Sequence, residues 1–308
     1  MAAATPQASL ALRNIVIAGD FSPSSESALL HAVSIAHHYG SVLHFSYVVQ
    51  PALFSMIPPD GYMGTPEAED YAMDLARSDA KKLVGDVLHR THCEDIENRV
   101  WVDLGAVGET VCGIIQREHI DLAVVGTHGR TGLRKLVLGS AAEDVFRHAS
   151  CPVLTVGPHC WRSDPYAPHL KHVLFPTDLS ADSIRALPIT LAIAAKFDAR
   201  VTVLHVVERL DPEPAHDKPR VITGLEQRMR EMVSASGPIP PGMSFEVQFG
   251  KVADTVVETA SRLSADLVAF GLKAPDTHAD RLSWIHAYKI VCEVACPVLS
   301  LRGPHNPR

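Results

Sequence analysis

Cysteine is scarce in this sequence, and no two cysteines form a Cys-x-x-Cys pair. There are six cysteines in 308 residues. Such sparse and unpaired spacing argues against a disulfide framework and against a zinc knuckle. We therefore expect reduced thiols. The 17 histidines are more numerous, but they are scattered without the spacing of metal ligands. We expect no metal site formed by the protein alone.

Long hydrophobic runs are also missing. The longest, such as Leu122 to Val125 and Val201 to Leu204, are far shorter than the ~20 residues that cross a bilayer. The first ten residues, MAAATPQASL, lack the basic start and the apolar stretch of a secretory signal. The sequence thus predicts no membrane partner and a cytoplasmic location.

The chain has no excess of positive charge. Lysine and arginine together number 28 against 35 acidic residues, which gives a formal charge of −7 and a pI near 6.2. This balance gives no support to electrostatic binding of nucleic acid or of anionic lipid. What is present, 46% hydrophobic and 20% charged residues, suits globular cores. At ~150 residues per domain, the length indicates about two domains.

The sequence contains an internal repeat. Asp121-Leu-Ala-Val-Val-Gly126 matches Asp266-Leu-Val-Ala-Phe-Gly271, and Cys151-Pro-Val-Leu-Thr matches Cys296-Pro-Val-Leu-Ser. Both pairs are separated by 145 positions, so no residue is gained or lost between them. We infer a duplication. Its two copies are here called unit one and unit two.

Unit one spans residues 11–157 and unit two spans residues 170–303. Residues 158–169 between them contain three prolines and have no apolar period. Such a composition is typical of a linker. The sequence therefore predicts two tandem domains of the same fold.

Short apolar runs alternate with longer amphipathic stretches in unit one. This pattern favours a parallel sheet with helices on both faces, a doubly wound α/β fold. In such sheets a ligand binds at the carboxyl ends of the strands. The expected strands cover residues 14–18, 42–49, 97–103, 122–125 and 152–156, and the expected helices cover 22–39, 67–89, 107–118 and 138–148.

The stretch that follows the fourth expected strand carries the most specific chemistry. Gly126 and Gly129 allow a tight turn and close approach to a ligand, and Gly139-Ser140 opens the next helix. Free N–H groups at that helix start suit a phosphate. Ser140 could instead be a helix N-cap, with Glu143 completing a capping box. The two roles are compatible, and both stay open at this point.

The spacing G-x2-G-x9-G-[S/T] after an apolar strand resembles the nucleotide-binding signature of the universal stress protein family. Gly126, Gly129, Gly139 and Ser140 match it in full. The resemblance extends over both units, so the chain is similar to a tandem member. It implies a five-stranded sheet of order 3-2-1-4-5 in each unit and a bound ATP, accompanied by Mg²⁺, or a related adenine nucleotide. It also implies pairing through the last strands, as a homodimer or between the two units.

The resemblance also implies roles for individual residues. Asp20 would lie beside the ribose or adenine, and the backbone of Val48 would read the adenine edge. Ala18-Gly19-Asp20 stands where the family often has Pro-Thr-Asp, which keeps the carboxylate; Asp20 could alternatively be a turn or capping residue. The expected phosphate and ribose contacts are Gly126, His128, Gly129 and Arg130, with Gly139, Ser140 and Ala141 closing the triphosphate site.

Unit two shows the opposite pattern. It has Pro176-Thr177-Asp178, but the positions equivalent to the loop residues are Gly271, Ala274, Trp284 and Ile285. Two glycines and the serine are absent, and the tryptophan is expected to fill the space for phosphates. The sequence therefore predicts that unit two binds no triphosphate in this manner and acts as a structural or regulatory partner.

Three functions remain compatible with the sequence. The favoured one is an ATP-binding protein of stress response or signalling, in which bound nucleotide biases conformation or partner choice. A slow ATP hydrolase is an alternative, although the sequence has neither G-x4-G-K-[S/T] nor Ser-Gly-Gly-x-Asp-Ser and no catalytic residue can be assigned. The third is a nucleotide-free tandem scaffold.

Overall fold

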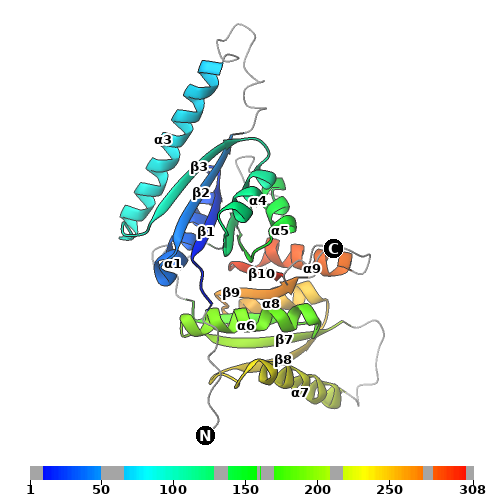
Figure 1. The fold of residues 1–308 in the computed structure, drawn as a ribbon. Helices are drawn as coiled ribbons and strands as arrows, with labels where there is room; N and C mark the ends of the chain where they lie inside the picture. Colours follow the sequence, from blue (N-terminus) through cyan, green and yellow to red (C-terminus); the bar gives the residue numbers. More distant parts are fainter. Residues whose placement is uncertain are drawn as a thin grey trace. The chain divides into compact units, whose positions relative to one another are not determined.

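The computed structural model describes residues 10–49, 66–127, 138–157, 160, 170–208, 218–272 and 280–302. Two compact units contain these residues, one from Leu12 to Pro168 and one that includes His169–Arg308. They correspond to unit one and unit two, and each alternates strands with helices (Figure 1). Residues 51–65, within the proline- and glycine-rich stretch of unit one, lie outside the described residues.

Unit one contains one five-stranded sheet in the order β3-β2-β1-β4-β5, with all described pairs parallel. Helix α1 contacts α3, and α4 contacts α5. These two helix pairs cover opposite faces of the sheet (Figure 1), as the sequence predicts. The elements are β1 (Asn14–Gly19), α1 (Pro23–Tyr39), β2 (Val42–Val49), α3 (Pro66–Arg90), β3 (Asn98–Leu104), α4 (Val107–Arg117), β4 (Leu122–Gly126), α5 (Ser140–His148) and β5 (Val153–Val156).

Unit two repeats this arrangement. Its strands lie in the order β8-β7-β6-β9-β10, again parallel. Helix α6 contacts α7, and α8 contacts α9. Both units thus have the expected order 3-2-1-4-5. The elements are β6 (His172–Pro176), α6 (Ala181–Lys196), β7 (Arg200–Val207), α7 (Lys218–Ser236), β8 (Ser244–Phe249), α8 (Val252–Leu263), β9 (Leu267–Leu272), α9 (Asp280–Glu293) and β10 (Val298–Arg302).

The central strands are apolar because helices cover both sides of the sheet. Three consecutive residues of β1, Ile15, Val16 and Ile17, are fully buried, so consecutive side chains enter two different cores. Helix α1 places Leu29 and Val33 against the same sheet. This packing holds the ends of the central strands at fixed positions.

The cysteines are free thiols, as expected. Five of them are buried, and Cys112 is partly exposed. Burial raises the pKa of the Cys151 thiol to about 12. A thiol that stays protonated is a poor nucleophile, so burial is a sufficient role for Cys151.

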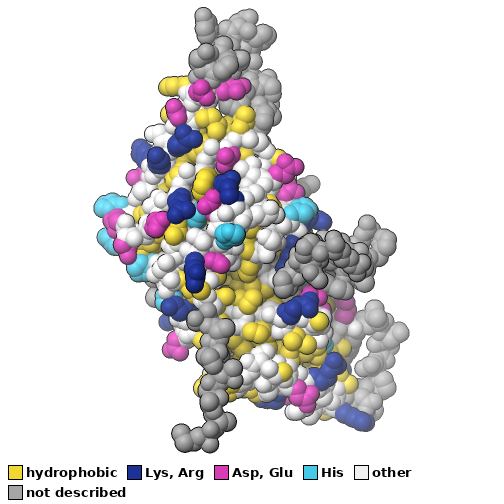
Figure 2. Space-filling model, in the orientation of Figure 1, with side chains coloured by type: hydrophobic (Ala, Val, Ile, Leu, Met, Phe, Trp, Pro, Cys, Tyr) yellow, Lys and Arg dark blue, Asp and Glu magenta, His cyan; other side chains and the backbone are white. Residues whose placement is uncertain are grey.

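Charged side chains of both signs are interspersed on the face drawn in Figure 2. Ion pairs such as Arg147 with Glu143 join neighbouring positions of one helix. None of the described helices is long and apolar enough to cross a membrane.

Candidate functional site

The expected nucleotide site lies where β1, β2 and β4 of unit one end. Ala18 is paired with Ser46 of β2 and with Val125 of β4, so the residues that follow these strands meet at one edge. The start of α5 is held at this edge because the Gly139 N–H donates to the Thr127 carbonyl over 2.8 Å. The structure thus brings Ala18, Gly19, Asp20, Val48, Gly126, Gly139, Ser140 and Ala141 to one end of the sheet. His128, Gly129 and Arg130 lie outside the described residues.

Asp20 forms the turn between β1 and α1. Its Oδ1 accepts a hydrogen bond from the Ser22 N–H at 3.0 Å, and its own N–H donates to Ser25 Oγ at 3.2 Å. Phe21 between them has a φ of 62°, in the left-handed region that non-glycine residues seldom occupy. The alternative role of Asp20, as a turn residue, is therefore confirmed.

Unit two builds the same turn with Asp178. Its Oδ1 accepts hydrogen bonds from the Ser180 N–H at 2.9 Å and from Ser183 Oγ at 2.7 Å, and Leu179 also has a φ of 62°. Burial acts to raise the pKa of the Asp178 carboxyl, but the hydrogen bonds from Ser180 and Ser183 outweigh it and hold this pKa below its usual value. The carboxylate of Asp178 is thus ionised at neutral pH.

Unit one has Gly19 where unit two has Thr177, and packing explains this difference. A β-carbon at Gly19 would overlap the ring of Phe45, which is fully buried in β2. In the amino-terminal part of the repeat the two units are offset by 158 positions, as Asp20 and Asp178 show. The equivalent of Phe45 in unit two is thus the smaller Val203, beside which Thr177 has room. The glycine in unit one therefore accommodates a larger core residue.

Gly126 is required by packing as well. A β-carbon there would lie 2.9 Å from the carbonyl oxygen of Ser24, in the first turn of α1. A β-carbon at the equivalent Gly271 would lie 2.8 Å from the Ser183 nitrogen in α6. Both glycines let the first helix of their unit approach β4 or β9 closely. Close packing thus explains Gly126 whether or not a ligand is also nearby.

The first helical residue of α5 is Ser140, and its N-cap is Gly139. The prediction that Ser140 caps the helix is therefore wrong. The bond from Gly139 to Thr127 fixes where the chain enters the helix, and the Glu143 N–H already donates to the Gly139 carbonyl. The Glu143 side chain pairs with Arg147 instead of forming a capping box. The exposed Ser140 is left beside the amides of the first turn of α5, which have no acceptor within the helix.

The equivalent helix of unit two begins earlier. Helix α9 starts at Asp280, whereas the counterpart of Ser140 is Ile285. Amides beyond the first turn of an α-helix donate to carbonyls four residues before them. The amides of Ile285, His286 and Ala287 are therefore hydrogen-bonded within α9. The equivalent amides in unit one, those of residues 140–142, belong to the first turn of α5.

Unit two nevertheless has a pocket at the ends of its strands. The cavity has a volume of about 230 Å³. Asp178, His205 and Gly271 line it from the strand ends, and His286 and Ala287 line it from α9. Trp284 is not among the lining residues; it is buried with the Arg302 guanidinium 5.3 Å from its ring centre. The ring therefore does not fill this pocket, and the expectation that it fills the phosphate position stays a prediction.

The model of the universal stress protein family matches residues 11–157 and again residues 169–302. The chain belongs to the universal stress protein family. It is 32% identical over 145 residues to a universal stress protein of Methanocaldococcus jannaschii. The alignment covers 47% of this chain and 81% of that protein. It is 30% identical over 144 residues to universal stress protein A homolog 1 of Coxiella burnetii, covering 47% of this chain and 95% of that protein.

Solved structures support the tandem fold. A universal stress protein from Archaeoglobus fulgidus superposes with a TM-score of 0.68 at 15% identity, covering 95% of this chain and 99% of that one. A putative universal stress protein from Pseudomonas aeruginosa gives a TM-score of 0.63 at 17% identity, covering 96% and 94%. At these identities the likeness shows the fold alone.

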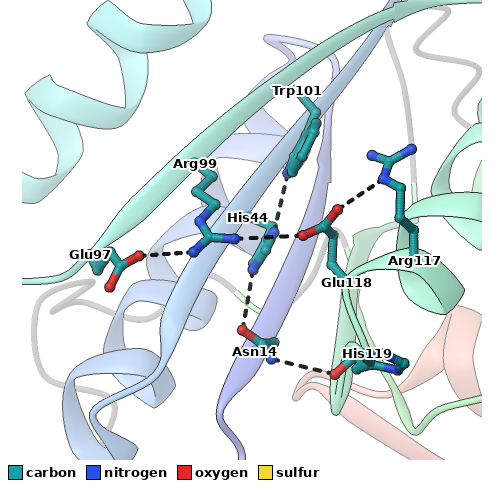
Figure 3. A network of polar contacts seen from close by, with 8 residues as sticks. All are labelled: Asn14, His44, Glu97, Arg99, Trp101, Arg117, Glu118 and His119. Atoms are coloured by element: carbon teal, nitrogen blue, oxygen red, sulfur yellow. Dashed lines mark hydrogen bonds and ion pairs between the residues drawn. The ribbon is translucent and has the colours of Figure 1, made fainter.

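A polar network lies at the opposite, amino end of the sheet in unit one of this universal stress protein (Figure 3). Trp101 Nε1 donates to His44 Nδ1 over 3.1 Å, and the two rings are nearly parallel. His44 Nε2 lies 3.4 Å from Asn14 Oδ1. Because Nδ1 accepts, the proton of the neutral ring is on Nε2, which donates to Asn14. Sequence reasoning missed this network because its members are distant in the chain.

The charges around His44 complete this network. The Arg117 guanidinium lies 4.6 Å from the Trp101 ring centre, and Glu118 bridges Arg117 and Arg99 at 2.8 and 3.6 Å. Burial lowers the pKa of His44, and the positive charge of Arg99 lowers it further. The network holds β1, β2, β3 and α4 together around a neutral histidine. It is therefore a structural feature of unit one.

The described residues hold no cluster of three or more His, Cys, Asp or Glu side chains that could bind a metal ion. In unit one, Asp20 is a carboxylate at the strand ends that this universal stress protein could offer to a metal carried by phosphates. Such a metal would depend on its ligand for most of its oxygen donors.

Proposed function

We propose that unit one (residues 11–157) binds ATP and that unit two (residues 170–303) binds no triphosphate in the same manner. The observation that carries this proposal is the difference between α5 and α9. Helix α5 begins at Ser140, beside the strand ends, and α9 begins five residues before the equivalent Ile285. Only the first arrangement leaves the amides of residues 140–142 for an anion.

The geometry of unit one supports this binding mode. The residues that end β1 and β4 are small, namely Ala18, Gly19 and Gly126. Ala18 and Gly126 are partly exposed and leave backbone accessible to a ligand, while Gly19 is buried. Gly139, Ser140 and Ala141 provide amides and a hydroxyl for the triphosphate, and the dipole of the nine-residue α5 favours negative charge there. Asp20 and the backbone of Val48 are proposed to contact the ribose and adenine. His128, Gly129 and Arg130 complete the proposed phosphate contacts.

Magnesium is part of the proposal only as a companion of the phosphates. Hard cations such as Mg²⁺ are usually held by one or two carboxylates together with phosphate oxygens. Asp20 is a suitable carboxylate of that kind. The chain would therefore show little affinity for Mg²⁺ without nucleotide.

We propose that the bound nucleotide regulates the protein and is not hydrolysed rapidly. A ligand shifts a conformational equilibrium only by its different affinity for the two states. In a stress response or signalling role, occupancy of unit one would change which partner the protein binds. A cytoplasmic location and pairing through the last strands, in a homodimer or between the units, belong to the same proposal.

Calorimetric titration with Mg-ATP tests the binding site. Gly139→Trp introduces the residue that unit two has at this position, and it should abolish binding. The backbone of Gly139 is extended, with a φ of −60° and a ψ of 148°, which any residue can adopt, so the fold should persist. Ile285→Trp places the same ring at an exposed position of unit two and should leave the affinity unchanged. Retained affinity in Gly139→Trp would refute the assignment.

A turnover assay separates this proposal from the hydrolase alternative. Phosphate release should be negligible over the time in which ATP binds and exchanges. Rapid multiple turnover at saturating Mg-ATP would contradict a regulatory nucleotide.

A further inference from the structure

The pocket of unit two has apolar walls and a small polar end. Val252 and Val256 of α8 and Ile290 of α9 supply apolar surface, and Asp178 and His205 lie at the ends of β6 and β7. A few convergent polar groups in an apolar pocket are the usual composition of a small-molecule site. At about 230 Å³, the cavity is smaller than the ~300–1,000 Å³ of sites for drug-sized ligands. It therefore suits a ligand with a single ring.

The polar groups of the pocket offer hydrogen-bond acceptors. Asp178 Oδ1 accepts from the Ser180 N–H and from Ser183 Oγ, and the second carboxylate oxygen, Oδ2, is also an acceptor. His205 Nδ1 lies 2.8 Å from the Thr177 carbonyl, which can only accept, so Nδ1 carries the proton. In the neutral ring Nε2 is then an acceptor. A ligand in this pocket would need N–H or O–H donors.

The charge of the pocket favours a cation. Asp178 is the sole formally charged side chain among its described lining residues, which include no lysine or arginine. A carboxylate attracts a donor of positive charge and disfavours a phosphate or a second carboxylate. The hydroxyl of Thr177 is occupied, because it accepts from the Leu179 N–H at 3.0 Å. No lysine or arginine among the described lining residues therefore balances the charge of Asp178.

We propose that this pocket binds a small organic cation, an amidine, guanidine or amine attached to an apolar ring. The cationic N–H groups donate to Asp178, and the ring lies against Val252, Val256 and Ile290. This ligand is of a different chemical class from the nucleotide proposed for unit one. The inference depends on unit two alone and holds whether or not unit one binds ATP.

Three probes of equal size and different charge test the proposal on the full chain. Benzamidinium, benzamide and benzoate can be titrated separately, with binding followed by ligand-observed NMR. Benzamidinium should bind most tightly, benzamide about tenfold more weakly, in line with the loss of a charged hydrogen bond, and benzoate not measurably. Equal affinities for the three probes would overturn the proposal. So would the absence of benzamidinium binding at a concentration of about 10 mM.

Two variants locate the site. Asp178→Asn keeps the Oδ1 acceptor for Ser180 and Ser183 but removes the charge, and it should weaken benzamidinium about tenfold. Asp20→Asn makes the same change at the matched carboxylate of unit one and should leave benzamidinium binding unchanged. A loss in Asp20→Asn with none in Asp178→Asn would place the probe in unit one and overturn the proposal.

A second variant tests the same pocket in case Asp178→Asn does not fold. Ala287→Leu adds bulk at a buried lining position of α9 and keeps the carboxylate. It should abolish benzamidinium binding while Mg-ATP binding is unaffected. Full benzamidinium affinity in this variant would show that the probe binds elsewhere.

Discussion

The ring of Phe45 occupies the space that a side chain at Gly19 would need. A β-carbon built on Gly19 would overlap this ring, which is fully buried between the helix layers of unit one. Unit two has Thr177 and Val203 at the same two positions. The two units thus fill one volume in different ways, with a large strand residue in one and a threonine in the other.

This relationship predicts a coupled pair of substitutions. Gly19→Thr should destabilise unit one by about 1–3 kcal/mol through overpacking, and Phe45→Val should destabilise it by leaving a cavity. The double variant should be more stable than the sum of the single effects predicts, since each change relieves the other. Urea unfolding of the four proteins measures this coupling. Strictly additive effects would show that the two positions do not compete for space.

Close helix packing predicts that Gly126→Ala is destabilising even without nucleotide. The added methyl group would meet the Ser24 carbonyl, at a cost of about 1–3 kcal/mol. Gly271→Ala should have a similar effect through the first turn of α6. Gly113→Ala in α4 is the control, because a β-carbon there meets nothing within 4 Å and helix propensity favours alanine by ~1 kcal/mol. Unchanged stability in both test variants would leave ligand contact as the reason for Gly126.

A reciprocal exchange between the units tests the role of the helix start. Ser140→Ile should weaken Mg-ATP binding about tenfold, because it removes a hydroxyl beside the charged phosphates. Ile285→Ser should not create a second site, because the amides around it are bonded within α9. Calorimetry gives both the affinity and the number of sites. A second site in Ile285→Ser would show that the side chain, and not the helix start, closes unit two.

The lowered pKa of His44 predicts that the free energy of unfolding depends on pH. Burial, assisted by Arg99, lowers the pKa of His44 in the folded protein, while the unfolded histidine keeps a pKa near ~6.5. The unfolded state therefore takes up a proton at a higher pH than the folded state. The free energy of unfolding should decrease as the pH falls below ~6.5 and level off below the native pKa.

Urea unfolding at a series of pH values measures this effect, with His44→Gln as the test variant. The variant should show a weaker decrease between neutral pH and pH 5. His172 of unit two, whose pKa burial also lowers, should account for a separate part of the decrease in His172→Gln. An identical pH profile in the wild type and both variants would contradict this account.

Local patterns in the sequence predicted the parallel α/β class and the two tandem units, and the family resemblance supplied the strand order. The buried strand at Ile15–Ile17 and the repeat at 145 positions are visible in the chain itself, and they led to the tandem sheet. The sequence predicted the start of α5 at Gly139-Ser140, but not the hydrogen bond from Gly139 to Thr127 that holds it there. The early start of α9 was not predictable, since an ungapped repeat gives no sign that one copy of a helix begins five residues earlier.

Contacts between distant residues were also beyond the sequence. Gly19 has its explanation in Phe45, on the neighbouring strand. Trp284 packs beside Arg302 and does not line the pocket beside Asp178, and that pocket was missed. The Pro176-Thr177-Asp178 motif was the available signal for that pocket.

The number of nucleotides bound per chain tests the central claim most directly. The protein would be purified without added nucleotide, denatured, and any released nucleotide identified and counted by chromatography, with a Mg-ATP titration of the emptied protein. We predict a total of one adenine nucleotide per chain, bound in unit one. Two per chain would contradict the closure of unit two, and none in either experiment would contradict the nucleotide site itself.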